Sequence, residues 1–141
     1  MTGPARLVAG PLQKALYAAL RADEGVTALV DGRVYDDVPE PAEYPYLVIG
    51  AAVEEADNTH DTFGRQADIA VHLWDEVDGF LRPADVVDAV VRLLDHQRDA
   101  LAIDGHQVVS IRFLDARMLR DPDPRIRHVP VRFRVNTQQE A

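Results

Sequence analysis

Cysteine is absent from the 141 residues of this chain, which excludes disulfides, thiolate nucleophiles and cysteine metal sites. A chain without cysteine fits a protein that folds in a reducing cytosol. Long hydrophobic runs are also absent, because none approaches the roughly 18 residues that a membrane-spanning helix needs. The first residues contain no basic segment followed by a long apolar one, so no signal peptide is expected. The composition, 47% hydrophobic and 28% charged residues, is typical of a globular domain with a real core.

Signatures of catalysis and cofactor binding are missing as well. The single serine, Ser110, has no Gly-x-Ser-x-Gly setting, and the eight glycines form no phosphate-binding loop. The five histidines show no metal-ligand spacing. Asp68 and His72 share a strand face with Glu76 nearby, but an ordinary half-exposed strand face explains this pattern better than a metal site does. We therefore expect no catalytic residue, no metal site and no cofactor.

Charge is distributed unevenly along the chain, whose net charge is −9. Residues 1–105 hold 8 Lys/Arg and 20 Asp/Glu, a net charge of −12, whereas residues 106–141 hold 7 Arg and 4 Asp/Glu, a net charge of +3. The chain is too acidic for a general nucleic-acid binder, because such binding rests on neutralising phosphates. In an assembling protein an acidic and a basic surface could meet head to tail. The alternative is that the C-terminal arginines line solvated strand faces.

The first half of the chain is expected to place helices and strands around a proline-rich loop. Apolar residues recur at helical spacing from Leu12 to Leu20. Three prolines exclude a helix or a central strand between Val38 and Tyr46. The run that follows is apolar on both faces and is the best candidate for a central strand in the sheet core. The expected elements are a loose arm or extra helical turn at 1–10, helices at 11–22 and 26–29, a strand at 34–38, the proline loop at 39–45, the central strand at 46–53 and a polar hairpin loop at 54–64.

The second half is expected to contain strands and one amphipathic helix. Pro83 is well placed to open that helix, which ends near His96. A change of parity after Phe113 indicates a bulge or a change of twist. Pro130 indicates that the last strand lies at an edge or is only partly laddered. The expected elements are an alternating strand at 66–74, the helix at 83–96, a hairpin from 100–103 through an Asp104-Gly105 turn into a strand from 107 onward, a turn at 121–125, a strand at 129–135 and a flexible tail at 137–141.

This order of elements predicts a single α+β domain over residues 1–141. Sequential strands joined by hairpins favour a mostly antiparallel sheet, with the N-terminal helix and the later amphipathic helix packed on one face.

Several short segments carry a family resemblance. They are the helix Leu12–Leu20, the succession Val34-Tyr35-Asp36, Val38-Pro39 and Tyr44-Pro45-Tyr46 through Gly50, the strand end Val71–Trp74, and the closing Arg120-Asp121 and His128–Val135. Over about residues 11–136 this succession resembles the tail completion, or tail terminator, family of long-tailed phages and gene transfer agents.

The resemblance implies a structural protein rather than an enzyme. Such proteins form a ring, usually a hexamer, that caps the finished tail tube, stops tube polymerisation and offers a surface to the head-side connector. The implied partners are further copies of the chain, the tail tube protein and the connector or stopper protein, with no membrane. DNA would pass through the ring without specific binding, which an acidic lumen would suit. The implied location is the bacterial cytoplasm during assembly and then the head–tail junction of the particle.

Candidate interaction residues follow from these expectations. We expect the proline loop to lie at a subunit or tube contact, and Trp74 to be a core or interface anchor. The candidate residues are Tyr44, Pro45, Trp74, Arg127, Arg132 and Arg134. Two alternatives stay open: another head–tail connector component, such as a stopper or adaptor, and a small ligand-binding α+β domain, which a deep pocket would favour.

Overall fold

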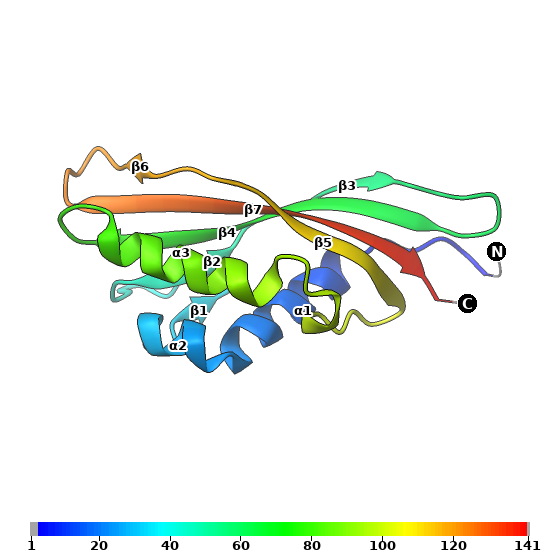
Figure 1. Cartoon of the computed structure of the whole chain (residues 1–141), viewed down its shortest axis with the longest axis horizontal. Helices are drawn as coiled ribbons and strands as arrows, with labels where there is room; N and C mark the ends of the chain where they lie inside the picture. Colours follow the sequence, from blue (N-terminus) through cyan, green and yellow to red (C-terminus); the bar gives the residue numbers. More distant parts are fainter. Residues whose placement is uncertain (1–2, 141) are drawn as a thin grey trace.

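The computed structural model describes residues 3–140 and has two layers, a seven-stranded sheet and helices packed against one of its faces (Figure 1). The expected α+β class, with an N-terminal helix and a mostly antiparallel sheet, is confirmed. The elements are α1 (Ala9–Ala22), α2 (Glu24–Val30), β1 (Val34–Tyr35), β2 (Tyr46–Ile49), β3 (Val53–Ala56), β4 (Gly64–Glu76), α3 (Leu81–Leu94), the 3-10 turn η1 (Arg98–Ala100), β5 (His106–Ala116), β6 (Leu119–Arg120) and β7 (Ile126–Gln139).

Two long antiparallel strands, β4 and β7, form the centre of the sheet. Their register runs without interruption from Gly64 opposite Gln138 to Glu76 opposite Ile126. The strand order is β1-β2-β4-β7-β5, with β3 also pairing with β4 and β6 also pairing with β7. The β1–β2 pair is parallel, and the remaining pairs are antiparallel. The opposite edges of the sheet are therefore β1 on one side and β5 with β6 on the other.

The hydrophobic core lies between the helices and the inner face of the sheet. The alternation predicted for β4 is confirmed, because every second residue from Ala67 to Leu73 is buried. The apolar stripes predicted for α1 and α3 are buried as well, with the exceptions of Ala19 and Leu93, which are only partly buried. Phe133 of β7 is the largest of the fully buried side chains in the described chain, and it is 1% exposed. Burial of this apolar surface is the main stabilising contribution to the fold.

The start of α1 is held by residues distant in sequence. Val8 precedes the helix and has no polar side chain, but the Glu54 carboxylate of β3 accepts hydrogen bonds from the Val8 N–H (2.9 Å) and the Ala9 N–H (3.0 Å). The Arg6 N–H donates to Oε1 of Gln139 (2.8 Å), whose Nε2 donates to the Pro4 carbonyl (2.9 Å). Residues 4–8 of the expected loose arm are thus tied to β3 and β7, and the helix begins two residues before Pro11; residues 1–2 lie outside the described part.

The predicted central strand at 46–53 is corrected in two ways. It is two strands, because β2 ends at Ile49 and β3 begins at Val53. Leu47 and Ile49 are buried as expected, but β2 is second from the edge of the sheet rather than at its centre, since it lies between the edge strand β1 and β4. The strand breaks at Gly50, where the backbone packs closely against β4. The Gly50 N–H donates to the Ala70 carbonyl (2.8 Å), and a Cβ at this position would lie 2.7 Å from Nε2 of His72. Beyond this break the inward alternation is lost, and Val53 is 67% exposed. The strand expected at 34–38 is likewise shorter, covering Val34–Tyr35 alone.

The predicted hairpin at 100–107 is wrong in its first strand. The Asp104-Gly105 turn is present, with φ of +77° at Gly105. The segment before it is the turn η1 followed by an irregular stretch, in which Leu101 and Ile103 are buried. The shift predicted after Phe113 is confirmed, and β5 contains a second shift at Val109.

The last strand is longer and more central than predicted. β7 continues to Gln139, with Thr137 only 3% exposed, so the expected flexible tail is strand over residues 137–139. Pro130 does not mark an edge, because it lies opposite His72 in the middle of the sheet. The alternative, a partly laddered strand, is confirmed: the Pro130 carbonyl accepts from the Arg117 N–H (3.2 Å), in the interval where β5 has ended and β6 has not begun. A residue without an N–H is tolerated at such an interruption.

Candidate assembly surfaces

The outer face of the sheet is not covered by any of the described helices (Figure 1). Its side chains come from the alternate residues of β4 and β7 that point away from the core. We call this surface the open face. Its central residues are Asp68, Ala70, His72 and Trp74 from β4 and His128, Pro130, Arg132 and Arg134 from β7.

Two arginines of the open face are neutralised within the chain. Arg134 donates from Nε to Oδ1 of Asp68 (2.9 Å) and from Nη2 to Oδ2 (3.1 Å). Arg132 forms the same kind of bidentate pair with Asp115 of β5: its Nε donates to Oδ1 (2.9 Å) and its Nη2 donates to Oδ2. The hydrogen bonds from Arg134 lower the pKa of Asp68, and those from Arg132 lower the pKa of Asp115. Arg132 and Arg134, both predicted as partner contacts, therefore already have carboxylate partners in the same protomer.

Trp74, His128 and His72 form an aromatic row on the same face. The Trp74 ring stacks on His128, with ring centres 4.0 Å apart and planes at 4°. Nδ1 of His72 lies 2.8 Å from Nε2 of His128, so one ring donates a hydrogen bond to the other. Burial lowers the pKa of both histidines, and the neighbouring His72 contributes to the lowered pKa of His128. Because Asp68 binds Arg134, these side chains are not assembled as a metal site; within residues 3–140, no cluster of three or more potential ligands occurs.

The proline loop between β1 and β2 is fastened by Arg33. The Arg33 guanidinium donates from Nε to the Pro45 carbonyl (2.9 Å) and from Nη2 to the Tyr44 carbonyl (3.0 Å). Pro45 is buried, so its ring is not available to a partner, whereas Tyr44 is 36% exposed beside Tyr46. The loop also carries a group of exposed carboxylates, which we call the acidic loop: Asp36, Asp37, Glu40 and Glu43.

Arg127 is a buried structural residue. Its side chain donates from Nε to the Gly79 carbonyl (3.2 Å) and from Nη1 to the Pro124 carbonyl (2.5 Å), and its guanidinium lies 5.1 Å from the centre of the Phe80 ring. Only 4% of the residue is exposed. It holds the loop between β4 and α3, and in this conformation it is not available to a partner.

The edge formed by β5 and β6 carries three arginines that were not among the candidate residues predicted from the sequence. Arg112, Arg117 and Arg120 are exposed, and within residues 3–140 none of them forms a salt bridge. Met118 and Leu119 lie between them and are 43% and 42% exposed. We call these five residues the arginine edge. The sequence showed an excess of arginine here, but it did not show which arginines have carboxylate partners.

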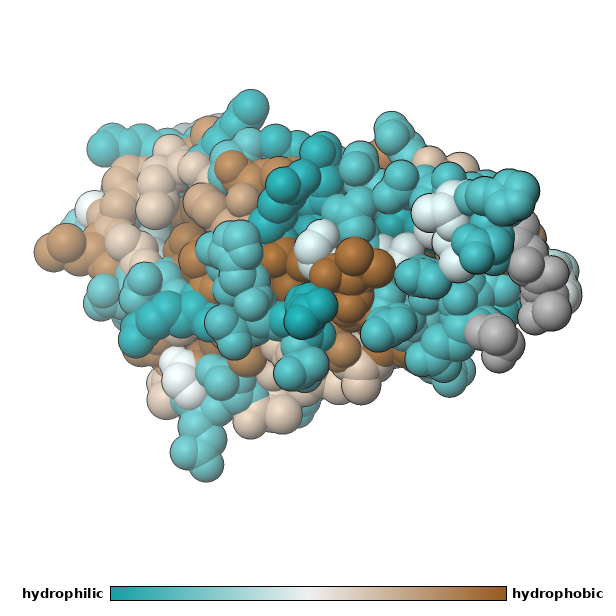
Figure 2. All heavy atoms as spheres, turned by 45° about the vertical axis from the view of Figure 1, so that its right-hand side comes forward, coloured by the Kyte–Doolittle hydropathy of each residue, from teal (hydrophilic) through white to brown (hydrophobic). Residues whose placement is uncertain are grey.

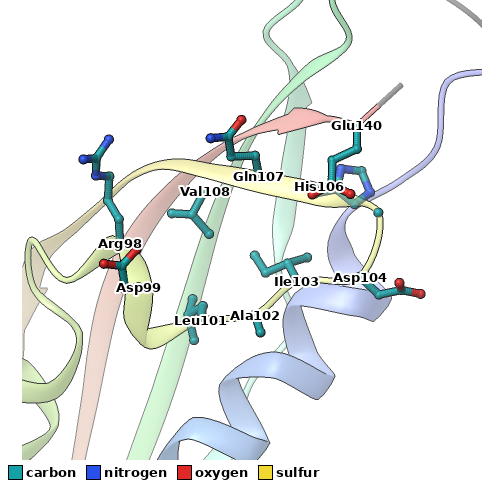
Figure 3. A pocket seen from close by; sticks show the side chains of 11 residues that line it. Arg98, Asp99, Leu101, Ala102, Ile103, Asp104, His106, Gln107, Val108 and Glu140 are labelled. Atoms are coloured by element: carbon teal, nitrogen blue, oxygen red, sulfur yellow. The ribbon is translucent and has the colours of Figure 1, made fainter.

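A hollow of about 730 Å³ lies between η1 and the start of β5, and it does not resemble a ligand site (Figure 3). It is open to solvent, and its charged residues are divided between its two ends, with Arg98 and Asp99 at one end and Asp104 and Glu140 at the other, rather than converging (Figure 3). Hydrophilic side chains cover most of the face shown in Figure 2, and hydrophobic ones gather there in small groups. As far as residues 3–140 are concerned, no helix has the length and apolarity to cross a membrane.

Comparison with known proteins gives the chain a family. A family model described as "Tail completion protein gp17" matches residues 14–138. A chain from the solved structure "Virion of native gene transfer agent (GTA) particle" superposes with a TM-score of 0.85 and 28% sequence identity, and the match covers 95% of this chain and 99% of that one. No curated protein matches significantly. Since the family model spans most of the sequence, the chain belongs to the tail completion protein gp17 family.

Proposed function

We propose that this protein is a structural part of a phage or gene transfer agent particle, where a ring of its copies, a hexamer, caps the tail tube. The ring ends tube polymerisation and joins the tail to the head-side connector. The observation that carries the proposal is the match to a chain of a gene transfer agent virion, because it covers 95% of this chain and 99% of that one.

The chemistry of the chain supports this proposal. A closed ring needs two different surfaces on each copy, and the sheet has chemically different edges, one acidic and one basic. The net charge of −9 disfavours a grip on phosphates, so DNA can move through the ring without specific binding. Copies assemble in the bacterial cytoplasm and remain at the head–tail junction, in contact with the tube protein and the connector.

Electron microscopy of particles from a deletion strain tests the proposal. Loss of the protein should give overlong tails or tails without heads, and the intact gene supplied in trans should restore tails of normal length joined to heads. Tails of normal length that fail to join heads would instead indicate a stopper or adaptor. Normal, complete particles from the deletion strain would refute a role in the particle.

A further inference from the structure

We propose that neighbouring copies in the ring contact each other through the arginine edge of one copy and the acidic loop of the next. This inference rests on the proposed ring, and it names the surfaces that build it. Each copy uses both surfaces once, so the contact is heterologous, which is the kind of contact that closes into a ring.

The two surfaces lie on opposite sides of the sheet. β5 and β6 pair only with β7 on one side, and the acidic loop directly follows β1, the last strand on the other side. Residues 117–120 of the arginine edge also lie toward the same end of the strands as the acidic loop, since Leu119 is opposite His128, His128 is opposite Trp74, and Trp74 is opposite Tyr46 at the end of the loop. Arg112 lies farther along β5, opposite Arg134. Rotation about an axis roughly along the strands would therefore bring the arginine edge of one copy against the acidic loop of its neighbour.

Several charges on these surfaces have no ionic partner within the described chain, although Glu43 lies 3.6 Å from Arg33 and the Arg120 guanidinium lies 5.8 Å from the centre of the Phe80 ring. No carboxylate of the described chain forms a salt bridge with Arg112, Arg117 or Arg120. On the acidic loop, Asp37 and Glu40 are exposed and likewise have no cationic partner among residues 3–140. By contrast, Arg132 and Arg134 already bind carboxylates of their own chain. Complementary free charges steer association and fix which surfaces meet.

Apolar side chains on both surfaces can form the apolar centre of the contact. Met118 and Leu119 are exposed between the arginines, and Tyr44 is exposed beside the carboxylates. A central apolar group surrounded by polar residues is the usual anatomy of a protein interface.

A strand of the neighbouring copy cannot pair along the whole of β5, so side chains make most of this contact. The middle of the β5 edge is already occupied, because the Asp95 carboxylate accepts from the Phe113 N–H (2.8 Å) and the His96 N–H donates to the Ile111 carbonyl (2.9 Å). These two bonds from the end of α3 block continuous pairing with a strand from another copy. The neighbour is therefore recognised by charge and by the small apolar group.

Disulfide trapping tests the contact cleanly, because the natural chain has no cysteine. The variant with Arg117→Cys and Glu40→Cys carries its two thiols on opposite edges of the sheet, so any disulfide joins two copies. Oxidation of particles from the complemented deletion strain, and of the purified protein, should give a ladder of linked copies that ends at the size of the ring. The matched control pairs Arg117→Cys with Thr59→Cys in the loop between β3 and β4, and it should give no ladder. Equal yields from both pairs would overturn the contact.

Charge reversal gives a second, independent readout. The Arg117→Glu/Arg120→Glu variant and the Asp37→Arg/Glu40→Arg variant should each fold, as shown by unchanged thermal melts, yet each alone should fail to restore normal tails. Producing both variants together, or all four substitutions in one chain, should restore tail length, because each reversed surface then meets a complementary one. Normal tails from either variant alone would overturn the inference.

The two proposals fail in different ways. Overlong tails in the deletion strain, with only control-level trapping of the Arg117–Glu40 pair, would overturn this contact and leave the proposed function intact. Normal particles in the deletion strain would overturn the proposed function, while a ladder from the purified protein would still establish the contact.

Discussion

Replacing Arg82 with methionine should destabilise the fold more than its partly exposed position suggests. Arg82 lies in the first turn of α3, and its guanidinium binds both oxygens of Asp75 at the end of β4, with Nε 2.8 Å from Oδ2. Asp75 is 0% exposed and points to the helix-covered face of the sheet. Methionine keeps the apolar stem of the side chain but removes the charge, so it leaves a buried carboxylate without this partner.

The size of the loss follows from the burial of the two groups. Removing one partner of a fully buried ion pair costs about 3–5 kcal/mol. The Arg82 side chain is 47% exposed, so water reaches part of the vacated space, and we expect about 2–3 kcal/mol. The unfolding entropy of a 141-residue protein is about 0.3 kcal/mol/K, so Tm should fall by about 7–10 °C.

Thermal melts followed by circular dichroism measure this loss. The matched control is Arg92→Met in the same helix, where Arg92 and Asp88 are 2.8 Å apart but 75% and 63% exposed, and where the cost should stay below about 0.5 kcal/mol. The double variant Arg82→Met/Asp75→Leu should recover most of the stability, because no charge is then left buried. Equal shifts of Tm for Arg82→Met and Arg92→Met would refute this reasoning.

Three further predictions concern the sheet. Gly64→Ala should cost about 2 kcal/mol in urea denaturation, because a Cβ there would lie 2.1 Å from the Asp57 carbonyl oxygen and the backbone must shift; an unchanged midpoint would contradict this. Phe133→Ala should cost about 3–5 kcal/mol in the same assay, since the side chain is fully buried, and a loss below about 1 kcal/mol would be inconsistent with that burial. Burial lowers the pKa of His72 and His128, so the unfolded chain takes up protons first, and the free energy of unfolding should fall as the pH drops below about 6.5. His72→Gln should make this fall shallower between about pH 7.5 and about pH 5.5, and an identical pH dependence would argue against the histidine pair as its source.

The sequence predicted those elements whose signal lies within one segment. The alternation of β4 and the apolar stripes of α1 and α3 are local periodicities, and each was sufficient to place its element and its buried face. The fold class followed from the order of these elements, since short connections favour antiparallel neighbours.

The errors arose where a distant residue decides the local structure. The break after Ile49 depends on the approach of Gly50 to His72, and the two lie 22 positions apart in the sequence. The polar residues 137–139 read as a tail, yet they are strand because β4 and β5 lie on both sides of them. Leu101 and Ile103 have the spacing of a strand but are buried without strand pairing.

The sequence predicted the sign of the charge on the candidate surfaces, but it did not predict which residues carry the unpaired charges. The excess of arginine after residue 105 is visible in the sequence, whereas the pairing of Arg132 with Asp115 and of Arg134 with Asp68 appears only when strands come together. Because Arg132 and Arg134 have carboxylate partners in their own chain, the arginines of this region that form no salt bridge and are exposed are Arg112, Arg117 and Arg120.

The hydrogen bonds between Gln139 and residues 4 and 6 bring the first and last parts of the described chain side by side. A short peptide linker could therefore join them into a continuous backbone, and the chain could be reopened at an exposed loop as a circular permutant. Both ends also lie at the opposite end of the long axis from β6 (Figure 1). A reporter peptide fused to either end would emerge from the same spot, away from the arginine edge, and would mark the orientation of each copy in images of a particle.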